Sequence, residues 1–177
     1  MKNIWLLGIT LVLCLISCKK TENKLITNGI KTPPITSYYF IRHAEKDRND
    51  SLSKNPHLTD KGRLRAQKWI EVFKDIPFSA VYSTKYYRTQ ETALPIAKKH
   101  NLELTIYQPE TLDLTCFLDI TKNQNVLIVG HSNTTPEFVN KIIKSNKYPP
   151  ISDTNFANFY TVKIVAGKIT SSQSKMP

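Results

Sequence analysis

Two histidines and two arginines stand where the sequence predicts the ends of β-strands. Arg42 and His43 follow the apolar run at 38–41 (YYFI), His131 follows the run at 125–130 (NVLIVG), and Arg88 follows a third short strand. Packing gives no reason for such side chains there, because burying a charged group is costly. Guanidinium groups bind phosphate oxygens bidentately, and a neutral imidazole can act as a nucleophile. We therefore predict phosphoryl-transfer chemistry in one pocket formed by these four residues.

Alternating strand and helix patterns indicate how these residues could meet. We expect strands over residues 37–42, 79–83, 102–107 and 125–130, helices from about 59, over 86–100 and over 135–145, a weaker helix around 112–121, and a hairpin over 156–165 and 168–172. This alternation is typical of an α/β domain with a mostly parallel sheet, whose site lies at the carboxyl ends of the strands. In the first helix we expect an N-cap at Thr59 or Asp60 and an apolar face that includes Leu64 and Trp69.

The N-terminus has the pattern of a secretion signal. Lys2 precedes an apolar stretch at residues 4–16 that is short for a membrane span, and small Ser17 leads to Cys18. This pattern resembles the bacterial lipoprotein signal, in which the cysteine becomes the lipidated N-terminus. It implies a signal peptide over residues 1–17, a flexible tether over 18–35 and a domain over 36–177, anchored in the bacterial cell envelope through Cys18. An ordinary secretory signal or an uncleaved anchor is the alternative.

Composition narrows the classes of partner and site. The chain has 177 residues and a formal net charge of +11, which suits one domain that binds an anionic small molecule or an anionic membrane surface. It has no Arg-rich stripe, so we expect no nucleic-acid partner. Cys116 would remain after processing, and we expect it to be a buried small hydrophobe. The four histidines are widely spaced, so we expect no metal site and no cofactor.

Four sequence blocks, taken together, resemble the histidine phosphatase superfamily, which has the phosphoglycerate-mutase-like fold. The blocks are RHAE at 42–45, LTDKGR at 58–63, VYSTKYYRTQETA at 81–93 and GHSN at 130–133. The resemblance spans residues 36 to 165 and implies a three-layer α/β/α sandwich with a mixed, mostly parallel sheet, in the small single-domain branch. It also implies that His43 is the phosphorylated nucleophile and that Arg42, Arg88 and His131 form the phosphate pocket.

The proton donor is the least defined part of the predicted site. Ser132 follows His131, so the His-Asp pair of the acid phosphatases is absent. Glu110 is our first candidate for protonating the leaving group, and Asp113 is the second. Candidate substrate contacts are Asn49, Ser132 and Asn133.

These observations predict a metal-independent phosphatase that acts as a monomer on a small phosphorylated substrate. A phosphomonoester or a phosphoramidate would be hydrolysed through a phosphohistidine at His43. Because the sequence offers no clear proton donor for the leaving group, a second hypothesis stays open. In this hypothesis the protein is a non-catalytic module of the same fold that binds a phosphate ligand or a protein. A mutase is a third hypothesis, although it would need further segments to hold a bisphosphate.

Overall fold

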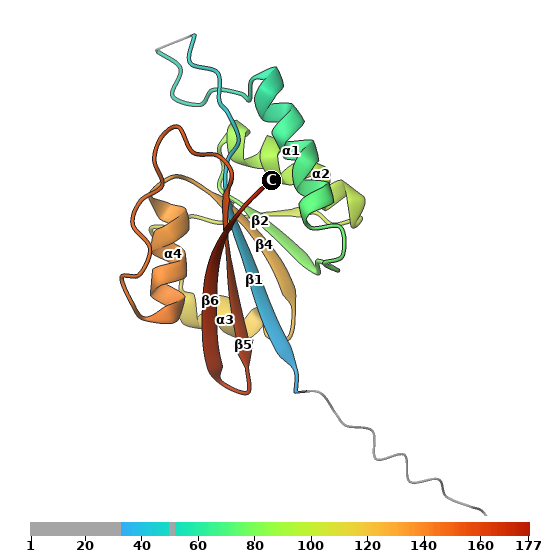
Figure 1. Ribbon diagram of the computed structural model, residues 1–177, viewed down its shortest axis with the longest axis vertical. Coiled ribbons are helices and arrows are strands. Elements are labelled where there is room, and N and C mark those ends of the chain that lie inside the picture. Colours follow the sequence, from blue (N-terminus) through green and yellow to red (C-terminus); the bar gives the residue numbers. More distant parts are fainter. Residues whose placement is uncertain (1–32, 50–51) are drawn as a thin grey trace, which may run out of the picture. The chain divides into compact units, whose positions relative to one another are not determined.

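A six-stranded sheet forms the centre of the computed structural model, which describes residues 33–49 and 52–177 (Figure 1). The strands are β1 (Ile35–Arg42), β2 (Ala80–Ser83), β3 (Leu104–Ile106), β4 (Asn125–Gly130), β5 (Asn158–Val165) and β6 (Lys168–Lys175). They lie in the order β3-β2-β4-β1-β5-β6, with parallel pairing from β3 to β1 and antiparallel pairing from β1 to β6. The sheet is therefore mixed and mostly parallel, as predicted.

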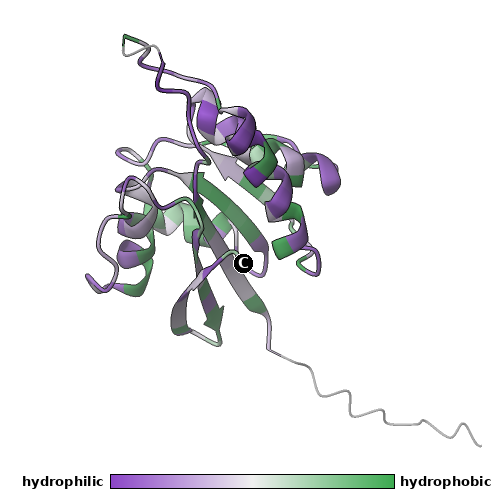
Figure 2. Cartoon of the chain, turned by 45° about the horizontal axis from the view of Figure 1, so that its top comes forward, coloured by the Kyte–Doolittle hydropathy of each residue, from purple (hydrophilic) through white to green (hydrophobic). Residues whose placement is uncertain are grey.

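Helices of the described chain cover both faces of the sheet. One face packs against α1 (Asp60–Val72) and α2 (Tyr87–Lys99), and the other against α3 (Leu114–Ile120) and α4 (Thr134–Ile143). Side chains alternate along β1, so Tyr38 and Phe40 join the core under α3 and α4, while Tyr39 and Ile41 join the core under α1 and α2. Figure 2 shows the hydrophobic colouring concentrated on the central strands. These layers confirm the predicted three-layer α/β/α sandwich.

The first helix begins where the sequence predicts, but it buries a different face. Thr59 is the N-cap, and its Oγ1 accepts a hydrogen bond from the backbone N of Gly62 at 3.0 Å. A Cβ on Gly62 would lie 2.2 Å from the backbone oxygen of Glu45, so the helix packs on this backbone at Gly62. Ala66 and Trp69 follow on the same face and are buried. Leu64, which we expected on that face, is 65% exposed.

The prediction that Cys116 is buried is wrong. Cys116 is exposed on α3, a helix of seven residues that buries Phe117. The carboxylate of Asp113 caps this helix, and its Oδ1 accepts hydrogen bonds from the backbone N of Thr115 at 2.9 Å and of Cys116 at 3.1 Å. A helix this short buries only a narrow stripe, which leaves the neighbour of Phe117 in solvent.

The predicted signal peptide, Cys18 and the tether up to residue 32 lie outside the described residues. β1 already begins at Ile35, the last residue that we assigned to the tether. Within residues 33–49 and 52–177, no helix is both long enough and apolar enough to cross a membrane.

Candidate active site

The carboxyl ends of β1 and β4 lie side by side and bring His43 and His131 together. Arg42 is opposite Gly130 in the parallel register, and the backbone N of His43 donates to the oxygen of Gly130 at 2.9 Å. The centroids of the two imidazole rings are 5.5 Å apart. Glycine permits the close packing at position 130, since a Cβ there would lie 2.8 Å from Thr135 Oγ1. The predicted meeting of both histidines at one edge of the sheet is what the structure shows.

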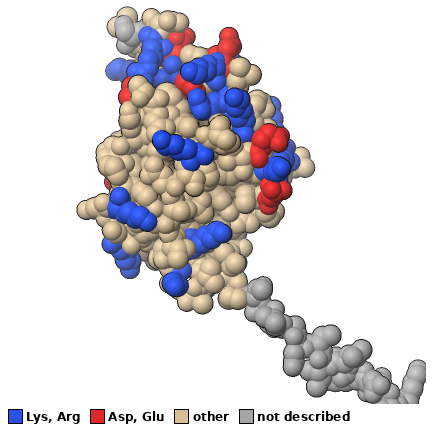
Figure 3. All heavy atoms as spheres, in the orientation of Figure 1, with Lys and Arg blue, Asp and Glu red and all other residues tan. Residues whose placement is uncertain are grey.

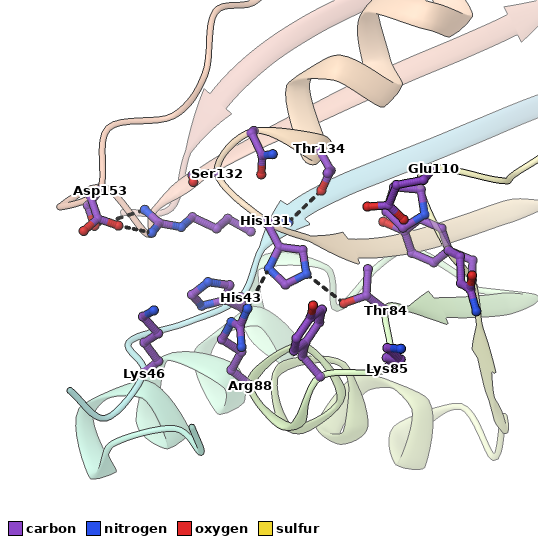
Figure 4. A pocket seen from close by; sticks show the side chains of 16 residues that line it. His43, Lys46, Thr84, Lys85, Arg88, Glu110, His131, Ser132, Thr134 and Asp153 are labelled. Atoms are coloured by element: carbon purple, nitrogen blue, oxygen red, sulfur yellow. Dashed lines mark hydrogen bonds and ion pairs between the residues drawn. The ribbon is translucent and has the colours of Figure 1, made fainter. Parts of the chain in front are cut away.

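The two histidines line an open pocket with a volume of about 510 Å³ (Figure 4). The predicted site residues that line it are Arg42, His43, Arg88, Glu110, His131, Ser132 and Asn133. Asn49 is described by the structure but does not line this pocket. Its backbone N instead donates to Asp47 Oδ1 at 2.9 Å in an exposed turn. The structure thus brings together seven of the predicted residues and leaves Asn49 in the turn that follows β1.

The hydrogen bonds of His43 define which of its nitrogens can attack. Nδ1 lies 2.7 Å from the backbone oxygen of Ala44. A carbonyl oxygen only accepts, so Nδ1 must carry the proton and donate it to this oxygen. The unprotonated lone pair is then on Nε2. The side chain is 96% buried at the base of the pocket, a position that suits a nucleophile held in one orientation.

His131 has the opposite tautomer. Arg88 Nη2 can only donate, and it lies 3.4 Å from His131 Nδ1, so Nδ1 accepts and Nε2 carries the proton. His131 Nε2 then donates to Thr84 Oγ1 at 2.9 Å, and the Thr84 hydroxyl donates to Thr89 Oγ1 at 2.8 Å. Thr89 in turn donates to the backbone oxygen of Tyr86 at 2.8 Å. Both ring nitrogens of His131 are therefore engaged by the protein.

Burial and the neighbouring guanidinium groups keep both imidazoles neutral. Burial is the main cause that lowers the pKa of His43 to about 3; the hydrogen bond to the Ala44 carbonyl opposes this shift, and the neighbouring Arg42, His131 and Arg88 add to it. Burial, followed by the charges of Arg88, Arg42 and Lys46, lowers the pKa of His131 to about 4. An imidazole must be neutral to attack phosphorus, and this environment provides that form at neutral pH.

Backbone carbonyls hold the guanidinium group of Arg42. Its Nη1 donates to the oxygens of Ser152 at 2.9 Å, Asp153 at 3.1 Å and Asn155 at 3.1 Å, and Nη2 donates to Asp153 Oδ1 at 2.7 Å. The guanidinium carbon lies 4.4 Å from the centroid of the Phe156 ring. Its Nε is buried and has no hydrogen-bond partner in the described part of the chain. The loop at 152–156 thus fixes Arg42 while leaving one buried N–H free.

Arg88 has far fewer partners than Arg42. Its guanidinium carbon lies 4.3 Å from the centroid of the Tyr86 ring, and Nη2 makes the long contact with His131. Nε and Nη1 are both buried, and neither has a hydrogen-bond partner among the described residues. Buried cationic N–H groups without acceptors are costly, so these donors and the Nε of Arg42 are ready for an anion. Three unpaired guanidinium nitrogens therefore surround the pocket that contains His43.

The carboxylates near the site have separate roles. Glu110 lines the pocket, and its charge, after burial, contributes to the raised pKa of Tyr107. Asp113, our second candidate for the proton donor, is the N-cap of α3 and does not line the pocket among the described residues. Glu45 pairs with Arg65, which donates from Nε at 2.9 Å and from Nη2 at 2.7 Å. Burial raises the pKa of Glu45, but these hydrogen bonds hold it below its ordinary value.

Some pocket residues were not assigned from the sequence. They are Lys46, Thr84, Lys85, Tyr86, Tyr107, Gln108, Pro109, Thr134 and Asp153. Thr84 and Lys85 could have been found, because they follow β2 at the same edge of the sheet. No sequence pattern could have indicated Asp153, because it lies in the loop before β5 and reaches Arg42 only when that loop folds back to the end of β1. The described residues contain no group of three or more His, Cys, Asp or Glu side chains that could hold a metal ion.

Comparison with known proteins gives a family match for part of the chain. Residues 38–112 match the model of the histidine phosphatase superfamily (branch 1). This segment includes Arg42, His43 and Arg88 and ends before His131. No curated protein matches the sequence.

Solved structures share the fold at low sequence identity. A phosphoserine phosphatase mutant from Entamoeba histolytica, in complex with phosphoserine, is 16% identical with a TM-score of 0.60, covering 80% of this chain and 96% of its own. A phosphoglycerate mutase from Bacillus anthracis is 17% identical with a TM-score of 0.62, covering 81% and 94%. The protein histidine phosphatase SixA, in complex with tungstate, is 16% identical with a TM-score of 0.59, covering 78% and 96%.

The matched segment carries Arg42, His43 and Arg88, whereas His131 follows β4 outside this segment. Residues 38–112 thus resemble the histidine phosphatase superfamily (branch 1), and the chain shares its fold with these solved structures.

Proposed function

We propose that the protein hydrolyses a phosphomonoester or a phosphoramidate through a phosphohistidine on His43. The observation that carries this proposal is the fixed tautomer of His43, whose Nδ1 donates to Ala44 and whose Nε2 is free in a pocket with three unpaired guanidinium nitrogens. A nucleophile and donors for phosphoryl oxygens are the two parts that phosphoryl transfer requires. The phosphatases among the structural neighbours support the same reaction class.

In the first step, His43 Nε2 attacks the phosphorus atom and the bond from phosphorus to the leaving oxygen or nitrogen breaks. The unpaired nitrogens of Arg42 and Arg88 donate to the phosphoryl oxygens and stabilise the charge spread over them. His131 holds Arg88 through Nδ1, so we assign it a positioning role in this step. Because Nδ1 of His43 keeps its proton on the Ala44 carbonyl, the intermediate is a cationic phosphoimidazole.

In the second step, water attacks phosphorus and the bond to Nε2 breaks. The cationic imidazole is a good leaving group, and its departure restores neutral His43. Glu110 is the pocket carboxylate that can give a proton to the leaving group in the first step and take one from water in the second. Replacing Glu110 by Gln should therefore slow hydrolysis of an alkyl phosphate more than that of an aryl phosphate, whose leaving group needs little protonation.

The test is hydrolysis of an aryl phosphate by residues 33–177, compared with the His43→Ala variant. We expect turnover by the wild-type domain, retention of that turnover in a chelator, and a loss on the order of 10⁶-fold in the variant, as for removal of a catalytic nucleophile. Rapid acid-free denaturation should trap a phosphate adduct of the wild-type protein, detectable by mass. Circular dichroism of both proteins shows whether the variant is folded.

Two outcomes would contradict the proposal. A folded wild-type domain that hydrolyses neither the aryl phosphate nor a phosphoramidate would favour the non-catalytic phosphate-binding module. Turnover that survives in His43→Ala would move the reaction to another residue. Loss of turnover in the chelator would show that the reaction needs a metal ion. The His43→Ala variant would still test whether His43 is the nucleophile.

We also propose that acyl chains on Cys18 anchor the protein in a bacterial cell envelope. The support is the sequence pattern alone: a basic residue, the apolar stretch at 4–16 and a small residue before Cys18. Several acyl chains would give stable attachment, because a single chain gives only marginal membrane binding. Full-length protein expressed in a bacterium should incorporate labelled palmitate and sediment with membranes, and Cys18→Ser should abolish both. Unlabelled wild-type protein would contradict the anchor.

A further inference from the structure

Asp153 pairs with the guanidinium group of Arg42, which would also bind the phosphoryl group of a substrate in the proposed reaction. Its Oδ1 lies 2.7 Å from Arg42 Nη2, and its Oδ2 lies 2.6 Å from Arg48 Nη2. The side chain of Arg42 is 3% exposed, whereas that of Asp153 is 65% exposed at the pocket wall. Figure 4 shows Asp153 on the side of the pocket away from Glu110, with its hydrogen bonds running to the guanidinium group.

The carboxylate is not needed simply to hold Arg42 in place. Three backbone oxygens already accept from Nη1, and these neutral groups fix the guanidinium without cancelling its charge. Asp153 adds one more acceptor and a full negative charge. An anion at the remaining donors of Arg42 would share one cation with this carboxylate, and two anions on one cation repel each other. The charge of Asp153 must therefore weaken anion binding at Arg42.

The other cationic side chains that line the pocket explain why weaker anion binding at Arg42 would favour turnover. Lys46, Lys85 and Arg88 line it, and no ion pair joins any of them to a carboxylate within the described residues. Lysine and arginine are also spread over the face of the molecule seen in Figure 3. Without an offsetting charge, this site would bind inorganic phosphate tightly. Product release would then limit turnover.

We propose that Asp153 is a positioning residue that holds Arg42 and offsets part of its charge, so that the site releases inorganic phosphate. This inference rests on the proposed phosphatase function. Arg48 belongs to the same arrangement, because it neutralises part of the Asp153 charge from the solvent side. The affinity for phosphate is therefore set by a chain of three charges, Arg42, Asp153 and Arg48.

The experiment compares Asp153→Asn with Asp119→Asn, which removes the same charge from the exposed surface of α3 outside the pocket. Asparagine keeps an oxygen that can accept from Arg42 but loses the charge. We expect Asp153→Asn to lower the inhibition constant of inorganic phosphate by about 3- to 10-fold, the scale expected for removing one nearby charge in a partly solvated site. Asp119→Asn should leave it unchanged. A merely structural loss would weaken phosphate binding, so tighter binding is specific to the proposal.

Arg48→Ala provides a second variant that does not disturb the buried Arg42. It leaves Asp153 less neutralised and should raise the inhibition constant of phosphate by about twofold. An unchanged or raised constant in Asp153→Asn would overturn the proposal, and so would unchanged binding in Arg48→Ala. Calorimetric titration with inorganic phosphate separates this failure from failure of the proposed function. Wild-type protein that neither turns over nor binds phosphate would contradict the function itself.

Discussion

The ends of β1 and β4 each deliver a histidine to the pocket, but the two ends hold it differently. At the end of β1, the side chain of His43 makes one hydrogen bond within the described residues, from Nδ1 to a backbone oxygen, and Nε2 has no partner there. At the end of β4, His131 is engaged through both ring nitrogens, with Arg88 on one side and Thr84 on the other. The same residue type therefore has two tautomers within one pocket.

In the reaction that we propose, this difference separates a reacting group from a supporting one. A nucleophile needs a free lone pair and a fixed direction, and a single backbone acceptor gives His43 both. A residue that orients a neighbour needs partners on both sides, and His131 connects the guanidinium of Arg88 to a series of threonine hydroxyl groups. Neighbouring strand ends can thus divide one reaction between them, because each presents its side chain from a rigid element.

Replacing His131 by Ala should have the largest effect among the tests of this division. We expect kcat for an aryl phosphate to fall by about 10²- to 10³-fold, the scale for losing one group that supports transition-state charge. The variant should still form a phosphate adduct on His43, which a rapid-denaturation mass measurement can detect. His57→Ala, at an exposed histidine outside the pocket, is the matched control. A variant without any adduct would make His131 part of the attack itself.

Replacing Gly130 by Ala should disturb both strand ends at once. The new Cβ would meet Thr135 Oγ1 at 2.8 Å and Tyr107 Oη at 3.0 Å. Such overpacking costs about 1–3 kcal/mol of unfolding free energy, measurable by urea denaturation. Removing one obstacle in the double variant with Thr135→Ala should recover part of the loss. Equal stability of Gly130→Ala and wild type would mean that the edge of the sheet adapts.

The low pKa values of the two histidines predict how stability depends on pH. Both are neutral in the folded state down to a pH of about 4, whereas unfolded histidines bind a proton near their ordinary pKa of 6.5. Below pH 6.5 the unfolded state therefore binds more protons, and stability falls by on the order of 1 kcal/mol per pH unit for each histidine. Urea unfolding at pH 7 and pH 5 should show this loss, and it should be smaller in His131→Ala.

Replacing Thr84 by Val should have the smallest effect, and it tests whether the hydrogen bond from His131 to Thr84 supports the reaction. It removes the acceptor of the Nε2 proton while keeping the shape, so the tautomer that accepts from Arg88 becomes less populated. We expect kcat to fall about 5- to 10-fold, the scale of losing one hydrogen bond at a buried group. Thr84→Ser keeps the hydroxyl and should behave as wild type. A rise in kcat in Thr84→Val would show that His131 acts by donating to the phosphoryl group directly.

Local pattern was sufficient for much of the fold. Apolar runs with polar ends located β1 and β4, and Thr59 marked the start of α1, because these signals depend on residues adjacent in the chain. The local pattern wrongly predicted that Leu64 and Cys116 are buried, because the exposure of these side chains depends on what packs against their helices. At Leu64 the deciding contact is the approach of Gly62 to Glu45, far apart in sequence and invisible to periodicity.

For the site, the sequence by itself determined which side chains meet in the pocket. Arg42, His43, Arg88 and His131 follow strands or open a helix, and parallel strands end at one edge. Only the tertiary structure decided how they are held. The carbonyls around Arg42 and the presence of Asp153 depend on a loop that folds back over more than one hundred residues of chain. The tautomer of His131 depends on Thr84 and Arg88, which are 47 and 43 residues away in the sequence. Hydrogen-bond partners at that distance are set by the packing of the whole domain, and no local spacing encodes them.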